Sequence, residues 1–180
     1  VFTTLVLCAK TLTAADLVVK GEVVHTVGNG TIDNGVVVIR NGRIRAVGSA
    51  DRVRVPRGVP VREAAVVTPG FVDARSTVGI SGVYGANAAQ VRDQDQLDKN
   101  DPLQPELRPV DAYNPDEALI EWVRKYGVTT MHTGHGPGAV VSGQTMIVKT
   151  WGKTADDVVV HDATAIAITL GRSPVSYTHL

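Results

Sequence analysis

The sequence predicts an α/β protein in which a small antiparallel sheet precedes the beginning of a parallel βα series. Three observations predict this fold class. Short segments rich in β-branched residues, separated by Asn-Gly and similar turns, fill residues 16–66. An apolar run broken by Pro69-Gly70 then leads into a polar cluster at 73–77. A helix with clear start and stop residues over 114–127 is followed at once by a strand-like segment.

The composition is that of an ordinary globular protein, and it excludes several classes of function. Of the 180 residues, 43% are hydrophobic and 20% are charged, which excludes a disordered chain. Lys+Arg and Asp+Glu both number 18, so no basic excess points to nucleic acid or to an anionic membrane. Cys8 is the only cysteine, which excludes a disulfide framework. We expect a small-molecule substrate as the partner, and an oligomer is compatible with the sequence.

Residues 1–15 have the pattern of the end of a secretory signal peptide. A short apolar run is followed by small residues, and cleavage after Ala14 or Ala15 fits the small-residue rule. The run is too short to span a membrane. The alternative is a buried strand of a cytoplasmic protein, and Lys10 is the residue that fits a signal peptide least. The sequence therefore predicts a periplasmic or secreted protein without a membrane segment once the signal is removed.

The segment 16–66 is expected to be an antiparallel sheet domain. Strands are predicted over 17–20, 22–27, 36–40 and 43–47, with turns at 28–30 and 33–35. Asn41-Gly42 predicts a tight hairpin, because both residue types tolerate positive φ. Pro56 and Pro60 interrupt the ladder and place the stretch around them in an edge or a loop.

The segment 67–173 is interpreted as the first βα units. Residues 90–109 are polar and punctuated by prolines, which predicts a long loop. Asn114 is expected to cap the helix that follows, with Glu117 completing a capping box and Gly127 ending the helix. Four residues with helical spacing are expected to form its buried face: Leu119, Trp122, Val123 and Tyr126.

The remainder of this segment alternates between strands and turns. Strands are predicted over 128–132 and 144–149, with a glycine-rich loop at 134–138 and a turn at Ser142-Gly143. Thr154 and Asp157 fit a helix cap, whereas 158–161 favours a strand, and both readings stay open. The C-terminal ends of parallel strands gather at one face. The polar residues at 73–77 and those at 132–138 are therefore expected on the same face of one structure.

The order of these elements resembles the amidohydrolase superfamily. Residues 35–48 and 68–74 carry the resemblance most strongly, the latter as Thr-Pro-Gly-Phe-Val-Asp-Ala. Gly-Val-Thr-Thr at 127–130 is similar to the second barrel strand of the imidazolonepropionase-like and related secreted branches. The resemblance implies the N-terminal part of a (β/α)8 TIM-like barrel, incomplete here, preceded by a small β-sandwich composite domain. It also implies one or two divalent metals, usually zinc, that activate water to attack a carbon–nitrogen bond.

The chain departs from this resemblance directly after Asp73. The resemblance places a His-x-His metal motif there, and the two histidine positions are Arg75 and Thr77. Arginine stays protonated and cannot ligate a metal, and threonine is a poor zinc ligand. Either a metal binds through later ligands only, or a different site is used, or hydrolysis has been lost. In the first case Arg75 becomes a candidate contact for an anionic group of the substrate.

Three further residues are candidates for a catalytic or ligating role: Asp73, His132 and His135. His132 ends a predicted strand and His135 lies in the glycine-rich loop, which are places suited to a metal ligand, an acid or base, or an oxyanion donor. The alternatives are structural. Asp73 then orients its own turn through nearby backbone groups, His132 faces the core, and the glycines serve only a tight loop.

The length and the last residues predict a fragment. A complete barrel needs about 250 residues, so two or three βα units fit after Thr68. Residues 174–180 look like a translated non-native tail. The predicted function is an amidohydrolase-type hydrolase of non-peptide amide, lactam or imide bonds, with the fragment itself inactive and prone to aggregate. The alternatives are an inactive barrel or binding protein without the His-x-His motif, and an unrelated periplasmic solute-binding module.

Overall fold

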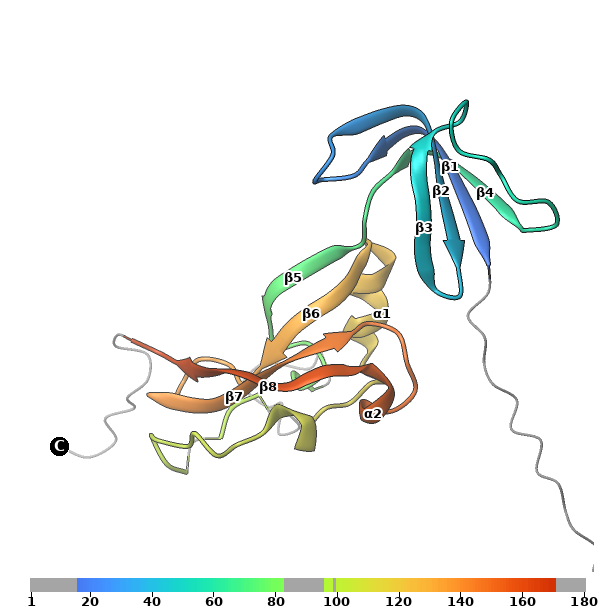
Figure 1. The fold of residues 1–180 in the computed structure, drawn as a ribbon. Helices are drawn as coiled ribbons and strands as arrows, with labels where there is room; N and C mark the ends of the chain where they lie inside the picture. Colours follow the sequence, from blue (N-terminus) through green and yellow to red (C-terminus); the bar gives the residue numbers. More distant parts are fainter. Residues whose placement is uncertain (1–15, 83–95, 99, 171–180) are drawn as a thin grey trace, which may run out of the picture. The chain divides into compact units, whose positions relative to one another are not determined.

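The computed structural model describes residues 16–82, 96–98 and 100–170. These residues form two four-stranded sheets, one in each of two compact units, Val1–Pro69 and Gly70–Leu180 (Figure 1). The α/β class is therefore confirmed. The predicted signal peptide over 1–15 and the predicted tail over 174–180 lie outside the described residues. Within the described ranges, no helix has the length and apolar character needed to cross a membrane.

The first unit is a mixed sheet with the strand order β3-β2-β1-β4. Its strands are β1 (Leu17–His25), β2 (Thr31–Arg40), β3 (Arg43–Ser49) and β4 (Val61–Val67). β1 and β3 are antiparallel to β2, but β4 is parallel to β1, so the prediction of a wholly antiparallel sheet is wrong at this strand. The connection between β3 and β4 packs Val53, Val55 and Val59 against the core of the sheet. This connection runs back along the sheet, so that β4 starts at the same end of the sheet as β1 and is parallel to it.

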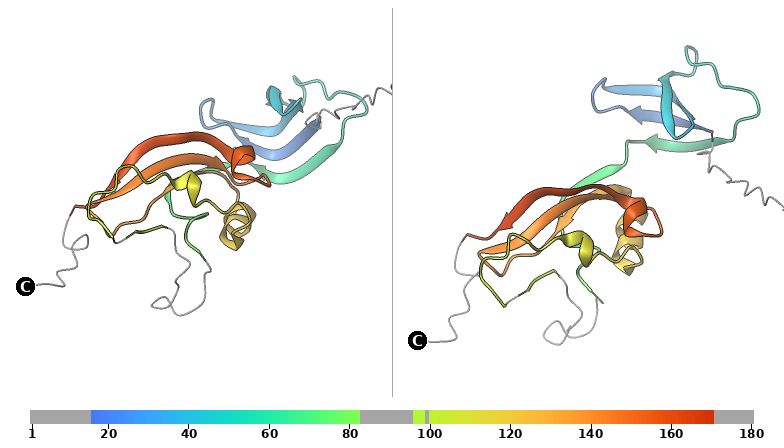
Figure 2. Two further views of the ribbon diagram at one scale, coloured as in Figure 1. Left: turned by 90° about the horizontal axis from the view of Figure 1, so that it is seen from below. Right: turned by 60° about the horizontal axis from the view of Figure 1, so that its bottom comes forward.

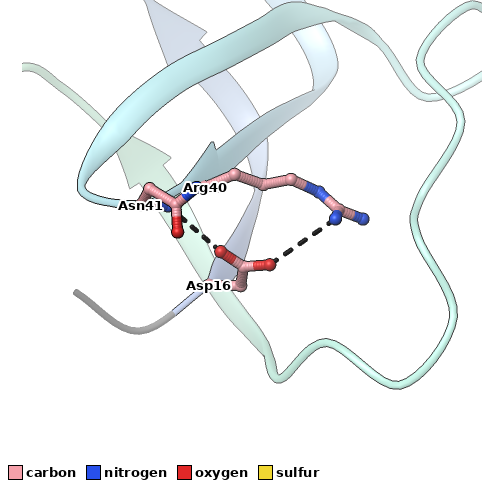
Figure 3. Close-up of polar contacts among 3 residues, drawn as sticks. All are labelled: Asp16, Arg40 and Asn41. Atoms are coloured by element: carbon pink, nitrogen blue, oxygen red, sulfur yellow. Dashed lines mark hydrogen bonds and ion pairs between the residues drawn. The ribbon is translucent and has the colours of Figure 1, made fainter. Parts of the chain in front are cut away.

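The Asn-Gly hairpin is confirmed. Asn41 and Gly42 have φ values of 52° and 69°, and they join the antiparallel strands β2 and β3. Asp16 ties this turn to the start of β1 (Figure 3). Its carboxylate accepts a hydrogen bond from the Asn41 amide at 3.1 Å and lies 3.6 Å from the Arg40 guanidinium. Asp16 thus links the start of β1 to the hairpin between β2 and β3.

The turn predicted at 33–35 is wrong, because these residues lie inside β2. The positive φ behind that prediction is real, since Asn34 has a φ of 47°. Pairing with β1 continues past it, with Asp33 opposite Val23 and Gly35 opposite Gly21. A Cβ at Gly35 would lie 2.4 Å from Cγ2 of Val24. The feature is therefore an irregularity within a strand, where glycine leaves room for a neighbouring valine.

The second unit has the strand order β5-β6-β7-β8. Its elements are β5 (Phe71–Ser76), η1 (Pro109–Asp111), α1 (Ala118–Lys125), β6 (Val128–Gly134), β7 (Val141–Lys149), α2 (Ala155–Val158) and β8 (Val159–Ile168). β5 and β6 are parallel, with α1 in the connection between them, as the sequence predicts. β7 and β8 are antiparallel to their neighbours, so the predicted parallel series is wrong beyond β6. Only a short loop joins Gly134 to Val141, and a parallel crossover needs a much longer connection.

Helix α1 is shorter than predicted, and its buried face matches the prediction only in part, since Val123 packs against the core but Trp122 and Tyr126 do not. It covers Ala118–Lys125 rather than 114–127, and Gly127, with a φ of 87°, ends it as expected. Its buried residue is Ile120, whereas Trp122 and Tyr126 are 56% and 66% exposed. The predicted capping box is absent because the Glu117 side chain is turned away from the helix. Its carboxylate bonds instead to the loop after β5.

The segment 154–161, which the sequence left uncertain, is now placed, and one predicted turn is corrected. Thr154 and Asp157 form a capping box at α2, and β8 begins directly afterwards, so both readings of this region are correct in turn. The turn predicted at Ser142-Gly143 is wrong, since both residues lie in β7. Gly143 has a φ of 130° there, and a Cβ at this position would lie 2.4 Å from the ring of His135.

One face of the second sheet carries the core. Helix α1 and η1 lie on the same side of β6 and β7 (Figure 2). The buried cluster on that side comprises Ile80, Tyr113, Ile120, Met131, Met146, Val148 and Val158. Residues that alternate with these along the strands point to the opposite face, where Val72 is 67% exposed and Lys149 is exposed. Along the described part of the chain, no helix covers this second face of β6.

Candidate functional site

The C-terminal ends of β5 and β6 bring together the residues that the sequence singles out. Asp73 and Arg75 are in β5, and Thr77 follows that strand directly. His132 is in β6, and His135 follows that strand. β5 and β6 are hydrogen-bonded neighbours in parallel register, with Ser76 opposite Thr133. The prediction that the two polar segments share one end of the structure is confirmed.

Asp73 makes a local hydrogen bond. Its Oδ1 accepts from the backbone amide of Arg75 at 3.1 Å, which is an Asx-type turn two residues long. This contact orients the backbone at the end of β5. It occupies one carboxylate oxygen and leaves the other for a further partner.

The Arg75 guanidinium joins the ends of the two strands. Nη1 donates to the carbonyl oxygen of Ser76 at 2.7 Å, and Nη2 donates to the carbonyl oxygen of His135 at 2.5 Å. These acceptors belong to the last residue of β5 and to the residue after β6. The methyl group of Thr77 faces the same loop, 3.5 Å from where a Cβ of Gly136 would stand. Two of the five guanidinium protons are therefore used for holding the loops together.

His132 lies in a hydrogen-bond network that crosses the whole second sheet. Its Nδ1 is 3.2 Å from the carbonyl oxygen of Ala74 on β5. Its Nε2 is 2.7 Å from Oγ1 of Thr145 on β7 and 2.9 Å from Oγ1 of Thr164 on β8. A carbonyl oxygen only accepts, so the contact with Ala74 places a proton on Nδ1, and Nε2 lies within hydrogen-bond distance of both threonine hydroxyls. Both ring nitrogens are thus engaged in linking four strands.

The threonine hydroxyls complete this network. Oγ1 of Thr164 donates to the Thr145 carbonyl at 3.0 Å, and the two hydroxyl oxygens are 3.0 Å apart. Oγ1 of Thr145 is also 3.3 Å from the carbonyl oxygen of Ala165. Thr145 is 4% exposed, so its polar atoms depend on these partners. No local pattern predicts this network, because Thr145 and Thr164 lie 13 and 32 residues from His132 along the chain.

His135 is buried between the loop that carries it and the segment before η1. Its side chain is 4% exposed, and neither ring nitrogen has a hydrogen-bond partner of good geometry among the described residues. Gly143 packs against the ring from β7, and the Gly136 amide donates to the Gln96 carbonyl at 2.6 Å. Burial lowers the pKa of His135 below its ordinary value of 6.5, and the Arg75 charge lowers it further. The nearby carbonyls of Gln96 and Leu107 and the Asp98 carboxylate oppose that shift.

Glu117 is a buried acid, and the prediction that it completes a capping box at the helix is wrong. It is 8% exposed, and its Oε2 accepts from the amides of Gly79 at 2.9 Å and Ser81 at 3.2 Å. Its Oε1 accepts from the Ser81 hydroxyl at 2.6 Å. Burial, followed by the Glu117 charge, raises the pKa of Tyr113 to about 12. The Glu117 carboxylate therefore holds the loop after β5 through three hydrogen bonds.

A groove of about 1060 Å³ lies between this loop and the start of α1. Residues 76–82 form one side, and Asn114, Glu117 and Trp122 are among those on the other. Of the candidate site residues predicted from the sequence, Thr77 lines the groove. The others do not: Asp73, Arg75, His132 and His135. The groove and the strand-end residues are thus neighbouring but separate features.

These residues do not fit a divalent metal ion. Along the described ranges, no group of three or more His, Cys, Asp and Glu side chains is arranged to hold one. Arg75 carries a permanent positive charge, and both nitrogens of His132 are already hydrogen-bonded. His135 is enclosed, and among the described residues it belongs to no group of three side chains that could hold an ion. The described residues at these strand ends therefore do not form a metal centre by themselves.

Comparison with known proteins supports the fold. No family model and no curated protein matches the sequence. The crystal structure of an amidohydrolase from Thermotoga maritima MSB8 aligns with a TM-score of 0.78 and 23% identity, over 88% of this chain and 40% of that chain. This chain therefore spans about two fifths of the length of that protein. The alignment shows that this chain has the fold of part of that amidohydrolase, in agreement with the resemblance seen in the sequence.

Two other solved structures align more loosely. N-acetyl-D-glucosamine-6-phosphate deacetylase from Mycobacterium smegmatis has a TM-score of 0.39 and 21% identity, over 67% of this chain and 24% of that one. An adenosine deaminase from Xanthomonas campestris with bound zinc has a TM-score of 0.36 and 17% identity, over 79% and 37% of the two chains. With TM-scores below 0.5, they add nothing to the assignment of the fold.

Proposed function

We propose that this chain is the N-terminal part of a hydrolase that cleaves non-peptide carbon–nitrogen bonds, in amides, lactams or imides. The observation that carries the proposal is the match in fold, over 88% of the chain, to an amidohydrolase more than twice as long. The substrate is a small molecule, and the protein is periplasmic or secreted. The part of the protein beyond this chain closes the barrel and completes the composite β-sandwich domain.

The arrangement of the second sheet supports this proposal. Its first two strands are parallel with a helix between them, which is the repeating unit of a barrel. Their C-terminal ends carry polar side chains, which is where the active sites of such barrels are built. The face of β6 away from α1 holds Thr130 and His132, with Lys149 donating to the Thr130 hydroxyl at 2.9 Å. A polar interior face of this kind suits a barrel that binds a polar substrate.

In this proposal the chain contributes the framework of the active-site mouth. Asp73, Arg75 and the His132 network fix the strand ends, and Glu117 fixes the loop after β5. The groups that activate the attacking water come from the part of the protein beyond this chain. The described residues do not supply them, and we expect this chain alone to be inactive.

A second candidate function is a barrel that binds a small molecule without cleaving it. Arg75 and Thr77, standing where the resemblance places metal-binding histidines, favour this reading. The two candidates make different predictions for the same experiment. Full-length protein is incubated with a panel of simple amides, lactams and imides, and released amines and acids are measured by mass spectrometry, with heat-denatured protein as the control. Cleavage supports the hydrolase, whereas saturable binding without product supports the binding protein.

A further inference from the structure

Arg75 occupies a place where the chain departs from its resemblance to amidohydrolases. The guanidinium has no lone pair and only donates, and its two partners, the carbonyls of Ser76 and His135, only accept. Each donor therefore faces an acceptor, and the two hydrogen bonds connect the end of β5 to the loop after β6. A planar fork with fixed donor directions is suited to such a bridge, and a flexible ammonium is less so.

Among the described residues, the remaining polar groups at this end do not form a set of three or more metal ligands. One oxygen of Asp73 accepts from the Arg75 amide at 3.1 Å. His132 uses Nδ1 toward Ala74 and Nε2 toward Thr145, at 3.2 and 2.7 Å. A divalent ion placed here would have to displace these bonds and would face the fixed charge of Arg75.

The Arg75 guanidinium holds the loop after β6 on the side that faces β5. On the other side it is held by the hydrogen bond from the Gly136 amide to the Gln96 carbonyl, at 2.6 Å, and by packing of His135 against Gly143. Removing the guanidinium takes away the link to β5 and leaves these other contacts in place.

We infer that Arg75 is a positioning residue that takes the place of a metal ion between the ends of β5 and β6, so that the full-length protein binds no divalent metal through these two strands. The inference rests on the amidohydrolase fold of the proposed function. Neither of its two tests measures turnover, so a failure of the proposed hydrolase activity does not affect their reading.

The first test is zinc binding by full-length protein, measured by competition with a chelating dye. The wild type, Arg75→Met and His132→Gln are expected to bind the same number of zinc ions, because the inference places no zinc ligand on β5 or β6. The double variant Arg75→His/Thr77→His is expected to bind one more, because two imidazoles two residues apart then replace the fixed charge. Loss of a zinc ion in folded His132→Gln or Arg75→Met, or no gain in a folded double variant, would overturn the inference.

The second test is hydrogen exchange at the Gly136 amide, which reports on the loop. Arg75→Met is expected to raise its exchange rate by about tenfold, since the charge-assisted hydrogen bond that ties the loop to β5 is lost. Arg75→Lys is expected to restore part of the protection, because an ammonium reaches one carbonyl but cannot span both. Circular dichroism checks that both variants fold. Wild-type exchange in Arg75→Met would show that the guanidinium does not position the loop.

Discussion

Replacing the buried acid Glu117 by glutamine tests whether it holds the loop after β5. The carboxylate accepts from the amides of Gly79 and Ser81 and from the Ser81 hydroxyl, at 2.9, 3.2 and 2.6 Å. Each hydrogen bond to a charged group contributes about 1.5–3 kcal/mol. Glutamine keeps one oxygen, but its NH2 group then faces a donor that needs an acceptor. We expect Glu117→Gln to lower the free energy of local opening by about 2 kcal/mol, which is close to the net loss of one such bond.

The assay is native-state hydrogen exchange at the amides of Gly79 and Ser81. A change of about 2 kcal/mol corresponds to an exchange rate about 30-fold faster. Ser81→Ala removes one of the three bonds and is expected to speed exchange at Gly79 by about fivefold. The matched control is Glu121→Gln on the same helix, whose carboxylate is exposed and pairs with Lys125 at 2.9 Å. This control is expected to leave both amides unchanged. Wild-type exchange at both amides in Glu117→Gln would refute the reasoning.

Three further predictions follow from the buried and networked side chains. The pKa of Tyr113, about 12, falls in Glu117→Gln because a negative charge that opposes ionisation is removed, and an ultraviolet titration measures it. The depressed pKa of His135 means that the unfolded chain binds a proton first as the pH falls, so stability present above about pH 6.5 is lost below it. Urea midpoints across this range are expected to fall less in His135→Gln than in the wild type. Nitrogen-15 NMR is expected to show a proton on Nδ1 of His132, because its partner there, the Ala74 carbonyl, only accepts, and an Nδ1 without a proton would contradict this contact.

The local features of the fold were predictable because they depend on neighbouring residues. Asn41-Gly42 specifies its hairpin through positive φ, and Gly127 ends its helix for the same reason. The parallel pairing of β5 and β6 followed from the helix between them. The same reasoning failed at β7, because the short loop after Gly134 reverses the chain and the strand pattern alone carries no direction.

The site was predictable in its location but not in its contacts. Placing 73–77 and 132–138 at one end required only the parallel pair, and the bond from Arg75 to the His135 carbonyl confirms it. Glu117 looked like a helix cap because it follows Asn114 by three residues, and only the folded chain shows that its acceptors serve a loop far away in sequence. The partners of His132 come from strands whose register no local pattern fixes.

The rate of carbon–nitrogen bond cleavage by full-length protein, measured alongside binding of the same amides, lactams and imides, tests the proposed function most directly. A hydrolase is expected to cleave at least one compound repeatedly, with product accumulating in proportion to the amount of protein. Folded protein that binds one or more of these compounds saturably and releases no product from any of them would contradict the proposal and favour the non-catalytic barrel.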